Sequence, residues 1–450
     1  MSQLQVLVAA SGTGWDAQLV QRLETAPSRI AVARRCVDLA DLLAAAGAGL
    51  GQAVLVPADL RRLDREALAV LQRGRVGVVG VLPGAEAAAD RLRLTQLGVR
   101  HVVSVDAATD TLTAAILAAV ADAEVAEKSP GSTTRGATDP ATTGIEDAIR
   151  AGGGSRAGDA DASAIDFIER GGERGRLIAV WGPCGAPGRT TLAVNIAMES
   201  ALIGQSTMLI DADTYGASVA QALGLLDEAP GLAGAARLAN SGQLDVISLA
   251  RYARRITPQL HVLTGIVRPS RWTELRASAL DAVWEQTRLV SAVTVVDCGF
   301  CLEEDESISF DSAAPRRNAA TLSTLRAADA IVVVAAGDPI GLGRLVRGLD
   351  ELAEVAPDTA AHVVVNRVRS SVAGADAEQQ IAAALNRYAG RTPYGFVPYD
   401  PQALDAALLS GLTLAETTPR SPARQAIREL AGRMLGAAAA PSRRLARLRR

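Results

Sequence analysis

The chain has 450 residues, of which 49% are apolar and 21% charged, and its formal net charge is −3. At about 150 residues per domain this length indicates two or three domains, and the apolar content excludes a chain that is disordered throughout. No apolar run reaches about 18 residues, and the N-terminus lacks a basic segment and a cleavage site, so we expect neither a membrane-spanning nor a secreted protein. Four scattered cysteines are too few for a disulfide framework and indicate a reducing cytoplasm. The small net charge gives no general case for binding nucleic acid.

The first quarter of the chain alternates short β-branched runs with helical patterns, which predicts a parallel sheet covered on both faces. The expected strands are Val6–Ala10, Ile30–Arg35, Ala53–Pro57, Val76–Leu82 and His101–Val105. The expected helices are Trp15–Glu24, Val37–Ala46, Arg65–Arg73, Glu86–Leu97 and Thr111–Ala123. This succession resembles the flavodoxin-like receiver domain of two-component regulators, and we assign it to residues 1–123.

The residues that make a receiver a phosphate acceptor are missing from this part. The family needs an acidic pair after the first strand, an aspartate at the end of the third and a lysine after the fifth. Ala9 and Ala10 stand at the first place and Pro57 at the second, with Asp59 out of register; the only lysine of the chain is Lys128. We therefore expect a degenerate receiver-like domain that docks or dimerises.

Residues 124–172 are rich in Gly, Ser, Thr, Pro and Asp and contain almost no large apolar residues. Such a segment cannot bury enough surface to offset the entropy of ordering it, which predicts a flexible linker.

The alternation of strands and helices restarts after the linker, and we assign residues 173–440 to a second, larger α/β domain. Its near-continuous apolar strands are typical of a sheet that is buried on both faces. The expected strands are Leu177–Trp181, Thr207–Ile210, His261–Leu263, Val293–Val296, Ile331–Ala335, Val363–Val365 and Gly395–Val397. The most strongly patterned helices are Thr190–Ile203, Leu342–Val355, Glu378–Tyr388 and Ala423–Met434.

The first strand of this domain runs into the turn GPCGAPGRTT, residues 182–191, and a helix follows directly. A strand, a glycine-rich turn and a helix together present backbone N–H groups and a positive helix end to phosphate. The P-loop pattern G-x-x-x-x-G-K-[ST] is incomplete here, because Pro183 replaces its first glycine and Arg189 its lysine. Thr190 is in place to bind Mg²⁺. For the turn alone, a Gly/Pro-rich connection without a ligand remains an alternative.

Further motifs follow in a characteristic order. They are LIDAD at Leu209–Asp213, TVVDCG at Thr294–Gly299, VVVNRV at Val363–Val368 and YGFVPYD at Tyr394–Asp400. With the turn, this set resembles the MinD/ParA superfamily of deviant-Walker ATPases, and the receiver-like front end makes the chain most similar to the CpaE/TadZ branch of pilus localisation and to actinobacterial septum-site-determining proteins. The resemblance implies a P-loop NTPase fold and the cofactors ATP and Mg²⁺.

The resemblance also implies roles for individual residues. Thr190 would bind Mg²⁺, and Thr191 would reach the α-phosphate. Asp211 and Asp213 match the carboxylates that organise the metal and the attacking water, Asp297 would act on the metal through water, and Asn366 would read the adenine edge. The phosphate-binding residues would be Cys184, Gly185, Ala186, Pro187, Gly188, Arg189, Thr190 and Thr191, and the catalytic pair Asp213 and Arg189. For each aspartate alone, capping of the following helix is the alternative.

Two departures from the family concern its lysines. Cys184 stands where the family has the lysine that reaches the dimer partner's phosphate, and Arg189 stands where it has the lysine that bridges the β- and γ-phosphates. A planar guanidinium does not replace a compact ammonium conservatively. We therefore expect nucleotide binding with weak or absent hydrolysis.

Three other features have both a functional and a plain structural interpretation. Cys298 and Cys301 form a C-x-x-C that could serve redox or zinc chemistry, although packing is the expected role. The acidic run Glu303–Glu306 is either a solvated loop or a regulatory insert. Arg251, Arg254 and Arg255, with Arg268 and Arg271, could form a basic face of the kind that ParA relatives use on DNA, although scattered arginines in solvent are the commoner interpretation.

The last ten residues, 441–450, form a basic tail that contains Leu445 and Leu448. It resembles a reduced form of the membrane-targeting helix of MinD proteins, and a disordered tail is the alternative.

These observations together favour a cytoplasmic, ATP-binding spatial regulator of pilus or secretion machinery or of the division site. We expect a homodimer with protein partners from that machinery, no specific nucleic acid, and weak contact with the inner face of the membrane through the tail. The alternatives are a nucleotide-independent dimeric scaffold and a ParA-like DNA-partitioning ATPase.

Overall fold

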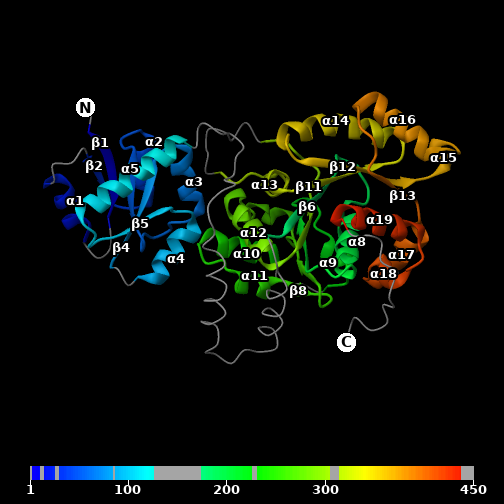
Figure 1. Ribbon diagram of the computed structural model, residues 1–450, viewed down its shortest axis with the longest axis horizontal. Coiled ribbons are helices and arrows are strands. Elements are labelled where there is room, and N and C mark those ends of the chain that lie inside the picture. The colour runs from blue at the N-terminus through cyan, green and yellow to red at the C-terminus, as the bar shows by residue number, and fades with distance from the viewer. Residues whose placement is uncertain are drawn as a thin grey trace. The chain divides into compact units, whose positions relative to one another are not determined.

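The computed structural model describes residues 3–10, 15–25, 30–84, 87–125, 174–225, 231–304 and 314–436. These residues form two compact units, each with its own sheet (Figure 1). Most of the expected linker at 124–172, the whole basic tail at 441–450 and part of the acidic run lie outside the described residues. None of the described helices combines the length and the apolar character needed to cross a membrane.

The N-terminal unit is a five-stranded parallel sheet with helices between its strands. Its strands are β1 (Leu4–Ala9), β2 (Ile30–Cys36), β3 (Ala53–Pro57), β4 (Gly77–Leu82) and β5 (His101–Ser104). Its helices are α1 (Trp15–Thr25), α2 (Leu39–Gly47), α3 (Arg65–Arg73), α4 (Ala88–Leu97) and α5 (Thr109–Val125). The order β2-β1-β3-β4-β5 is the doubly wound arrangement of flavodoxin-like folds. Apolar side chains from both faces of the sheet form two buried clusters, as a sheet covered on both sides requires.

The strands and helices expected from the sequence are all present in this unit, with ends that differ by two residues at most. At the position of a receiver's acceptor aspartate, β3 ends at buried Pro57, buried Ala58 follows, and Asp59 is exposed beyond them. The first strand ends at Ala9, so no carboxylate follows it directly.

The larger unit contains an eight-stranded sheet in the order β13-β12-β11-β6-β10-β7-β9-β8. Its strands are β6 (Arg176–Trp181), β7 (Thr207–Ala212), β8 (Arg254–Arg255), β9 (Leu260–Leu263), β10 (Val293–Cys298), β11 (Ala330–Ala336), β12 (Ala360–Val368) and β13 (Gly395–Pro398). All neighbours pair in parallel except β8, a two-residue edge strand that runs antiparallel to β9 and that the sequence pattern did not predict. The predicted α/β class is confirmed, with a parallel sheet in the N-terminal unit and a largely parallel sheet in the larger one.

Helices cover both faces of the larger sheet. They are α8 (Arg189–Leu202), α9 (Val219–Ala222), α10 (Gly231–Asn240), α11 (Val246–Tyr252), the short 3₁₀ segment η2 (Pro269–Glu274), α12 (Ala277–Val290), α13 (Ala319–Ala327), α14 (Pro339–Val355), α15 (Ser370–Ala373), α16 (Ala377–Ala389), α17 (Pro401–Ser410), α18 (Leu414–Thr417) and α19 (Pro422–Leu435). Figure 1 shows α14 and α16 on one side of the sheet and α8 and α19 on the other. A buried ion pair between Glu199 and Arg424, with 2.7 Å between Oε1 and Nε, joins α8 to α19. This ion pair fixes α8, the helix that follows the glycine-rich turn, against α19.

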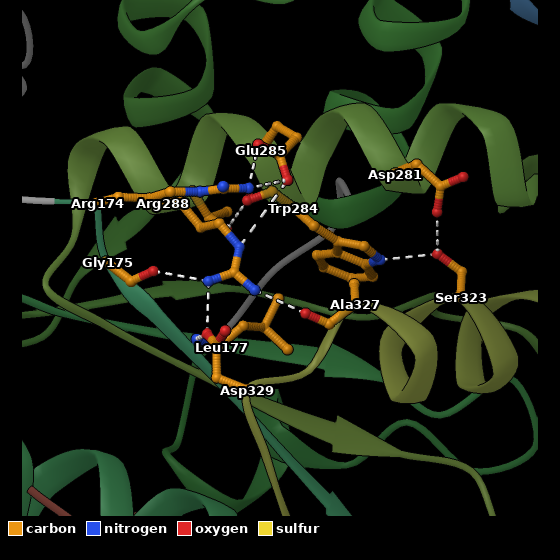
Figure 2. A network of polar contacts seen from close by, with 11 residues as sticks. Arg174, Gly175, Leu177, Asp281, Trp284, Glu285, Arg288, Ser323, Ala327 and Asp329 are labelled. Atoms are coloured by element: carbon orange, nitrogen blue, oxygen red, sulfur yellow. Dashed lines mark hydrogen bonds and ion pairs between the residues drawn. The ribbon is translucent and has the colours of Figure 1, made fainter. Parts of the chain in front are cut away.

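A polar network fixes the start of β6, the strand that leads into the turn (Figure 2). The buried Arg288 guanidinium donates to the carbonyl oxygen of Gly175 and to Oδ2 of Asp329, at 2.8 and 2.5 Å. The same Asp329 oxygen accepts the backbone N–H of Leu177 at 2.7 Å. Nη2 of Arg288 also donates to the carbonyl of Ala327. The network therefore ties β6 to α12 and to the residues before β11.

We expect Arg288→Met to lower the free energy of unfolding of the larger unit by about 2–3 kcal/mol, because Asp329 and two buried carbonyl groups lose a charged donor. Urea unfolding followed by tryptophan fluorescence measures this, since Trp284 lies within the network. Arg174→Gln is the matched control: Arg174 pairs with Glu285 in solvent, and its loss should cost less than about 1 kcal/mol. Equal losses in the two variants would contradict the assignment.

Candidate functional site

The turn between β6 and α8 has a backbone conformation that needs glycine. Gly185 and Gly188 have φ values of 74° and 90°, in the left-handed region that side chains disfavour. At Gly182 a Cβ would run into the carbonyl oxygen of Val334 in β11, so only glycine fits there. The glycines of the turn thus permit a tight, partly left-handed backbone that an ordinary connection between a strand and a helix does not need.

Gly188 is the N-cap of α8, and no side chain caps this helix end among the described residues. The first N–H groups of a helix have no partners within the helix, and together with the helix dipole they favour an anion. The turn and the first residues of α8 therefore present uncapped donors, as a phosphate-binding loop does.

Thr190, in the first turn of α8, connects this helix end to the neighbouring strand β10. Its hydroxyl donates to Oδ2 of Asp297 at 2.6 Å and lies 3.2 Å from Oγ of Ser218. The other oxygen of Asp297, Oδ1, is buried and has no hydrogen-bond partner among the described residues. A buried carboxylate oxygen without a donor is costly, so this atom is suited to accept from a water or to bind a cation.

Asp211 lies near the end of β7, where it is paired with Asp297 of β10, and Asp213 comes directly after β7. Oδ2 of Asp211 accepts the N–H of Val219 at 2.9 Å, and Oδ1 accepts the N–H of Asp213. Oδ1 of Asp213 accepts the N–H groups of Tyr215 and Gly216. The helix-capping interpretation thus applies in part, because Asp211 bonds the first residue of α9 as well as its own loop.

The carboxylates perturb one another strongly. Burial raises the pKa of Asp211 from 3.8 to about 6; hydrogen bonds from Val219 and Asp213 oppose the rise, and the charge of Asp213 adds to it. Burial, followed by the charge of Asp211, raises the pKa of Asp297 well above its usual value, against the hydrogen bond from Thr190. A cation in this position would relieve both effects.

Arg189 is folded back toward the turn and the carboxylates. Nη1 donates to the carbonyl oxygen of Gly182 at 3.2 Å, and Nη2 lies 3.6 Å from Oδ2 of Asp213. Its guanidinium carbon also lies 5.9 Å from the centre of the Phe300 ring. Arg189 thus keeps the positive charge of the family's lysine, but this charge already faces the carboxylate of Asp213.

Asn366 lies at the end of β12 and contacts the turn itself. Its Nδ2 donates to the carbonyl oxygen of Pro187 at 2.9 Å, and a Cβ on Gly188 would collide with this amide. The next residue, Arg367, has a φ of 56°, within an irregularity of the pairing between β12 and β13. The amide that we expect to read adenine therefore also supports the loop.

The remaining predicted residues differ in exposure. Cys184 is exposed on the turn, Ala186 is buried, and Thr191 is partly exposed and accepts from Asn195 through its carbonyl oxygen. Cys298 is buried and burial raises the pKa of its thiol well above the usual value, while Sγ of Cys301 accepts from Asn318.

The sequence alone did not identify several residues that line this region. Tyr215 donates through its hydroxyl to Asn318 at 2.8 Å, and the guanidinium of Arg317 stacks on its ring at 4.3 Å. These contacts join the segment after Asp213 to the residues before α13, while Ser218 in the same segment contacts Thr190. Only their closeness to the aspartates in sequence could have indicated Tyr215 and Ser218; Arg317 and Asn318 carried no such signal.

The donor set fits Mg²⁺ that is bound together with a phosphate. The described residues contain no group of three or more His, Cys, Asp or Glu side chains that could hold a metal ion by themselves. Mg²⁺ keeps several waters and takes one or two protein oxygens plus phosphate oxygens, which suits the Thr190 hydroxyl and the unpartnered oxygen of Asp297. The same donors would not suit a metal site built from protein ligands alone.

A separate open hollow of about 660 Å³ lies at the start of α17 and the turn between α18 and α19, lined by residues that include Asp400, Arg420 and Ser421. Asp400 already accepts the N–H of Ala403 and the hydroxyl of Ser421. Its carboxylate is thus committed to the fold, and the turn before α8 remains the candidate site.

No protein-family model matches the chain, and no curated protein sequence matches it. Among solved structures, the cell division ATPase MinD of Pyrococcus furiosus is similar with a TM-score of 0.45 and 19% identity, over 58% of this chain and 99% of that one. A ParA family ATPase of Chlorobium tepidum is similar with a TM-score of 0.48 and 16% identity, over 57% of this chain and 98% of that one. The ATP complex of Cyanothece McdA is similar with a TM-score of 0.47 and 17% identity, over 60% of this chain and 100% of that one. Identities this low do not establish a shared function, so the function has to be argued from the residues of the site.

The raised pKa values predict how stability depends on pH without Mg²⁺. A carboxyl whose pKa is higher in the folded state than in the unfolded state contributes stability at low pH that is lost as pH rises, here from 3.8 to about 6 for Asp211. We expect the unfolding midpoint to fall across this window, and the fall to be smaller in Asp297→Asn, which removes a second buried carboxyl whose own pKa is raised. Thermal unfolding in EDTA between pH 4.5 and 7.5 measures it.

The exposed Asp350 on α14 supplies the control for this experiment. Asp350→Asn should leave the pH dependence as in the unaltered protein. A pH profile of Asp297→Asn that matches the unaltered protein would contradict the account of the carboxylate cluster.

Proposed function

We propose that the larger unit binds Mg-ATP and that the protein is a spatial regulator of the MinD/ParA type with weak or absent hydrolysis. The observation that carries this proposal is the contact between Thr190 and Asp297 at the start of α8, where, within the described residues, no side chain caps the helix and one carboxylate oxygen has no partner. In this proposal, residues 173–440 form the nucleotide-binding domain, residues 1–123 a degenerate receiver-like domain, and residues 124–172 the linker.

The chain's own residues supply most of what a bound nucleotide requires. Backbone N–H groups of Gly185 and of residues 188–191 would hold the phosphates, while Thr190 and, through water, Asp297 would hold Mg²⁺. The metal would neutralise phosphate charge and offset the repulsion among the buried carboxylates. Asn366 would both support the loop and offer its Oδ1 to the base.

The state of Asp213 supports slow hydrolysis. One of its oxygens accepts two backbone N–H groups, and the other faces the guanidinium of Arg189 at 3.6 Å. A carboxylate held in this way is poorly placed to orient an attacking water and accept its proton. Arg189 is likewise engaged by Gly182, so it is not free to follow charge on a transferred phosphoryl group.

The regulatory role follows from the resemblance of the motifs rather than from any contact in this structure. One similar solved structure is the MinC:MinD cell division complex of Aquifex aeolicus, with a TM-score of 0.42 and 19% identity over 60% of this chain and 98% of that one. By analogy we propose a homodimer whose nucleotide state changes its affinity for protein partners of pilus, secretion or division machinery. The location would be cytoplasmic, with the basic tail at 441–450 adding weak contact with the membrane surface.

We expect Mg-ATP to raise the thermal unfolding midpoint of the full chain. A ligand at a thousandfold excess over its Kd stabilises by about 4 kcal/mol, which corresponds to several degrees for a unit of this size. The shift should be lost in Thr190→Ala and kept in Thr273→Ala, an exposed threonine on η2. The absence of any shift at millimolar ATP would support the nucleotide-independent scaffold, and salt-sensitive DNA binding would support the partitioning alternative.

We expect phosphate release from ATP to stay at the level of Asp213→Ala, because the groups that should assist the reaction are paired with each other. Single-turnover assays with excess protein would detect a slow reaction. Turnover at least tenfold above that of Asp213→Ala would contradict the proposal of weak hydrolysis without affecting that of binding.

A further inference from the structure

A second arginine, Arg344 on α14, lies directly against the turn. A Cβ built on Gly185 would lie 3.1 Å from the guanidinium carbon of Arg344 and 3.9 Å from its Cδ, and it would overlap Nη1. The guanidinium thus occupies the space that any side chain at Gly185 would need. No residue with a side chain could replace this glycine without moving Arg344.

Small residues bring α14 close enough for this contact. A Cβ on Gly348 would lie 3.1 Å from Pro183 and 3.2 Å from the Trp181 ring, so the helix packs against the start of the turn. Residues four apart lie on the same face of a helix, which places Arg344 one turn nearer the helix start on that face. Asp338 caps that end by accepting the N–H of Gly341. The position of Arg344 therefore follows from a closely packed helix.

Arg344 is a cation that no described carboxylate neutralises. It is exposed and forms no ion pair with any other described residue, whereas Arg189 lies beside Asp213. Cys184, next to Gly185, is exposed and contributes no charge where the resemblance leads one to expect a lysine. The one arginine that flanks the turn with its charge unpaired within the described residues is thus Arg344.

We propose that Arg344 is a phosphate-binding residue of this site and supplies, from the same chain, the positive charge that Cys184 lacks. This inference rests on the proposed binding of Mg-ATP at the turn. Its ligand is the phosphate chain of the nucleotide, because a guanidinium beside uncapped N–H groups adds charge-assisted hydrogen bonds to an anion. A dimer of this protein would then bind nucleotide without a lysine from the partner.

The test compares Kd values for Mg-ATP, measured by calorimetry on the full chain at 50 and 300 mM NaCl. We expect Arg344→Gln to weaken binding about tenfold at low salt, the size of effect that a charged hydrogen bond gives, and to reduce the dependence on salt. Arg344→Lys should restore most of the affinity. The matched control is Arg347→Gln, an exposed arginine on the same helix, which should change Kd less than twofold.

The outcomes separate this inference from the proposed function. If the unaltered protein binds Mg-ATP and Arg344→Gln binds it equally well, the inference is overturned and the proposed function stands. If Arg344→Gln and Arg344→Lys lose affinity equally with an unchanged salt dependence, Arg344 only supports the loop, and the inference is again wrong. If the unaltered protein does not bind, both fail. Unfolding midpoints without nucleotide should be the same for all three arginine variants, because both side chains are exposed.

Discussion

The hydrogen bond between Thr190 and Asp297 joins the two parts on which the site depends, the helix end and the sheet edge. The parallel register of the sheet makes this bond available, because Asp297 in β10 is paired with Val180 in β6 and with Asp211 in β7. Since the carboxyl ends of parallel strands meet at one edge, the turn after β6 and the carboxylates after β7 and β10 converge there. A shift of one residue in any of these strands would separate the turn from its carboxylates.

Concentrating carboxylates at a buried edge is unfavourable for folding alone. Asp211 and Asp297 are each 1% exposed, and both have raised pKa values because burial and the charges of neighbouring aspartates disfavour their charged forms. Arg189 offsets part of this charge through Asp213, but one oxygen of Asp297 has no partner in the part of the chain that the structure describes. The fold thus tolerates an arrangement that a bound cation and anion together would satisfy, which is typical of a binding site rather than of a structural core.

The sequence predicted the strands and helices that are marked by a local pattern of apolar residues. Strand ends such as β3 and helix spans such as α3 were predicted to the residue, and the strands that carry the aspartates were found, because continuous apolar runs mark buried parallel strands. The edge strand β8 was missed, since two exposed arginines form no apolar pattern. Helix α14 begins three residues earlier than expected, because Asp338 caps it before Pro339. Arg344 could not be foreseen at all, since its place beside Gly185 depends on how closely α14 packs against the turn.

The central claim is that the turn before Thr190 holds a triphosphate together with Mg²⁺, although it lacks both lysines of the family that it resembles. Calorimetric titration of the full chain with ATP, once with Mg²⁺ and once with EDTA, tests this most directly. The account predicts saturable binding of one nucleotide per chain that weakens strongly when the metal is removed, because the carboxylates then face the phosphates unshielded. Saturable binding that is indifferent to Mg²⁺, or no heat at millimolar ATP, would contradict it.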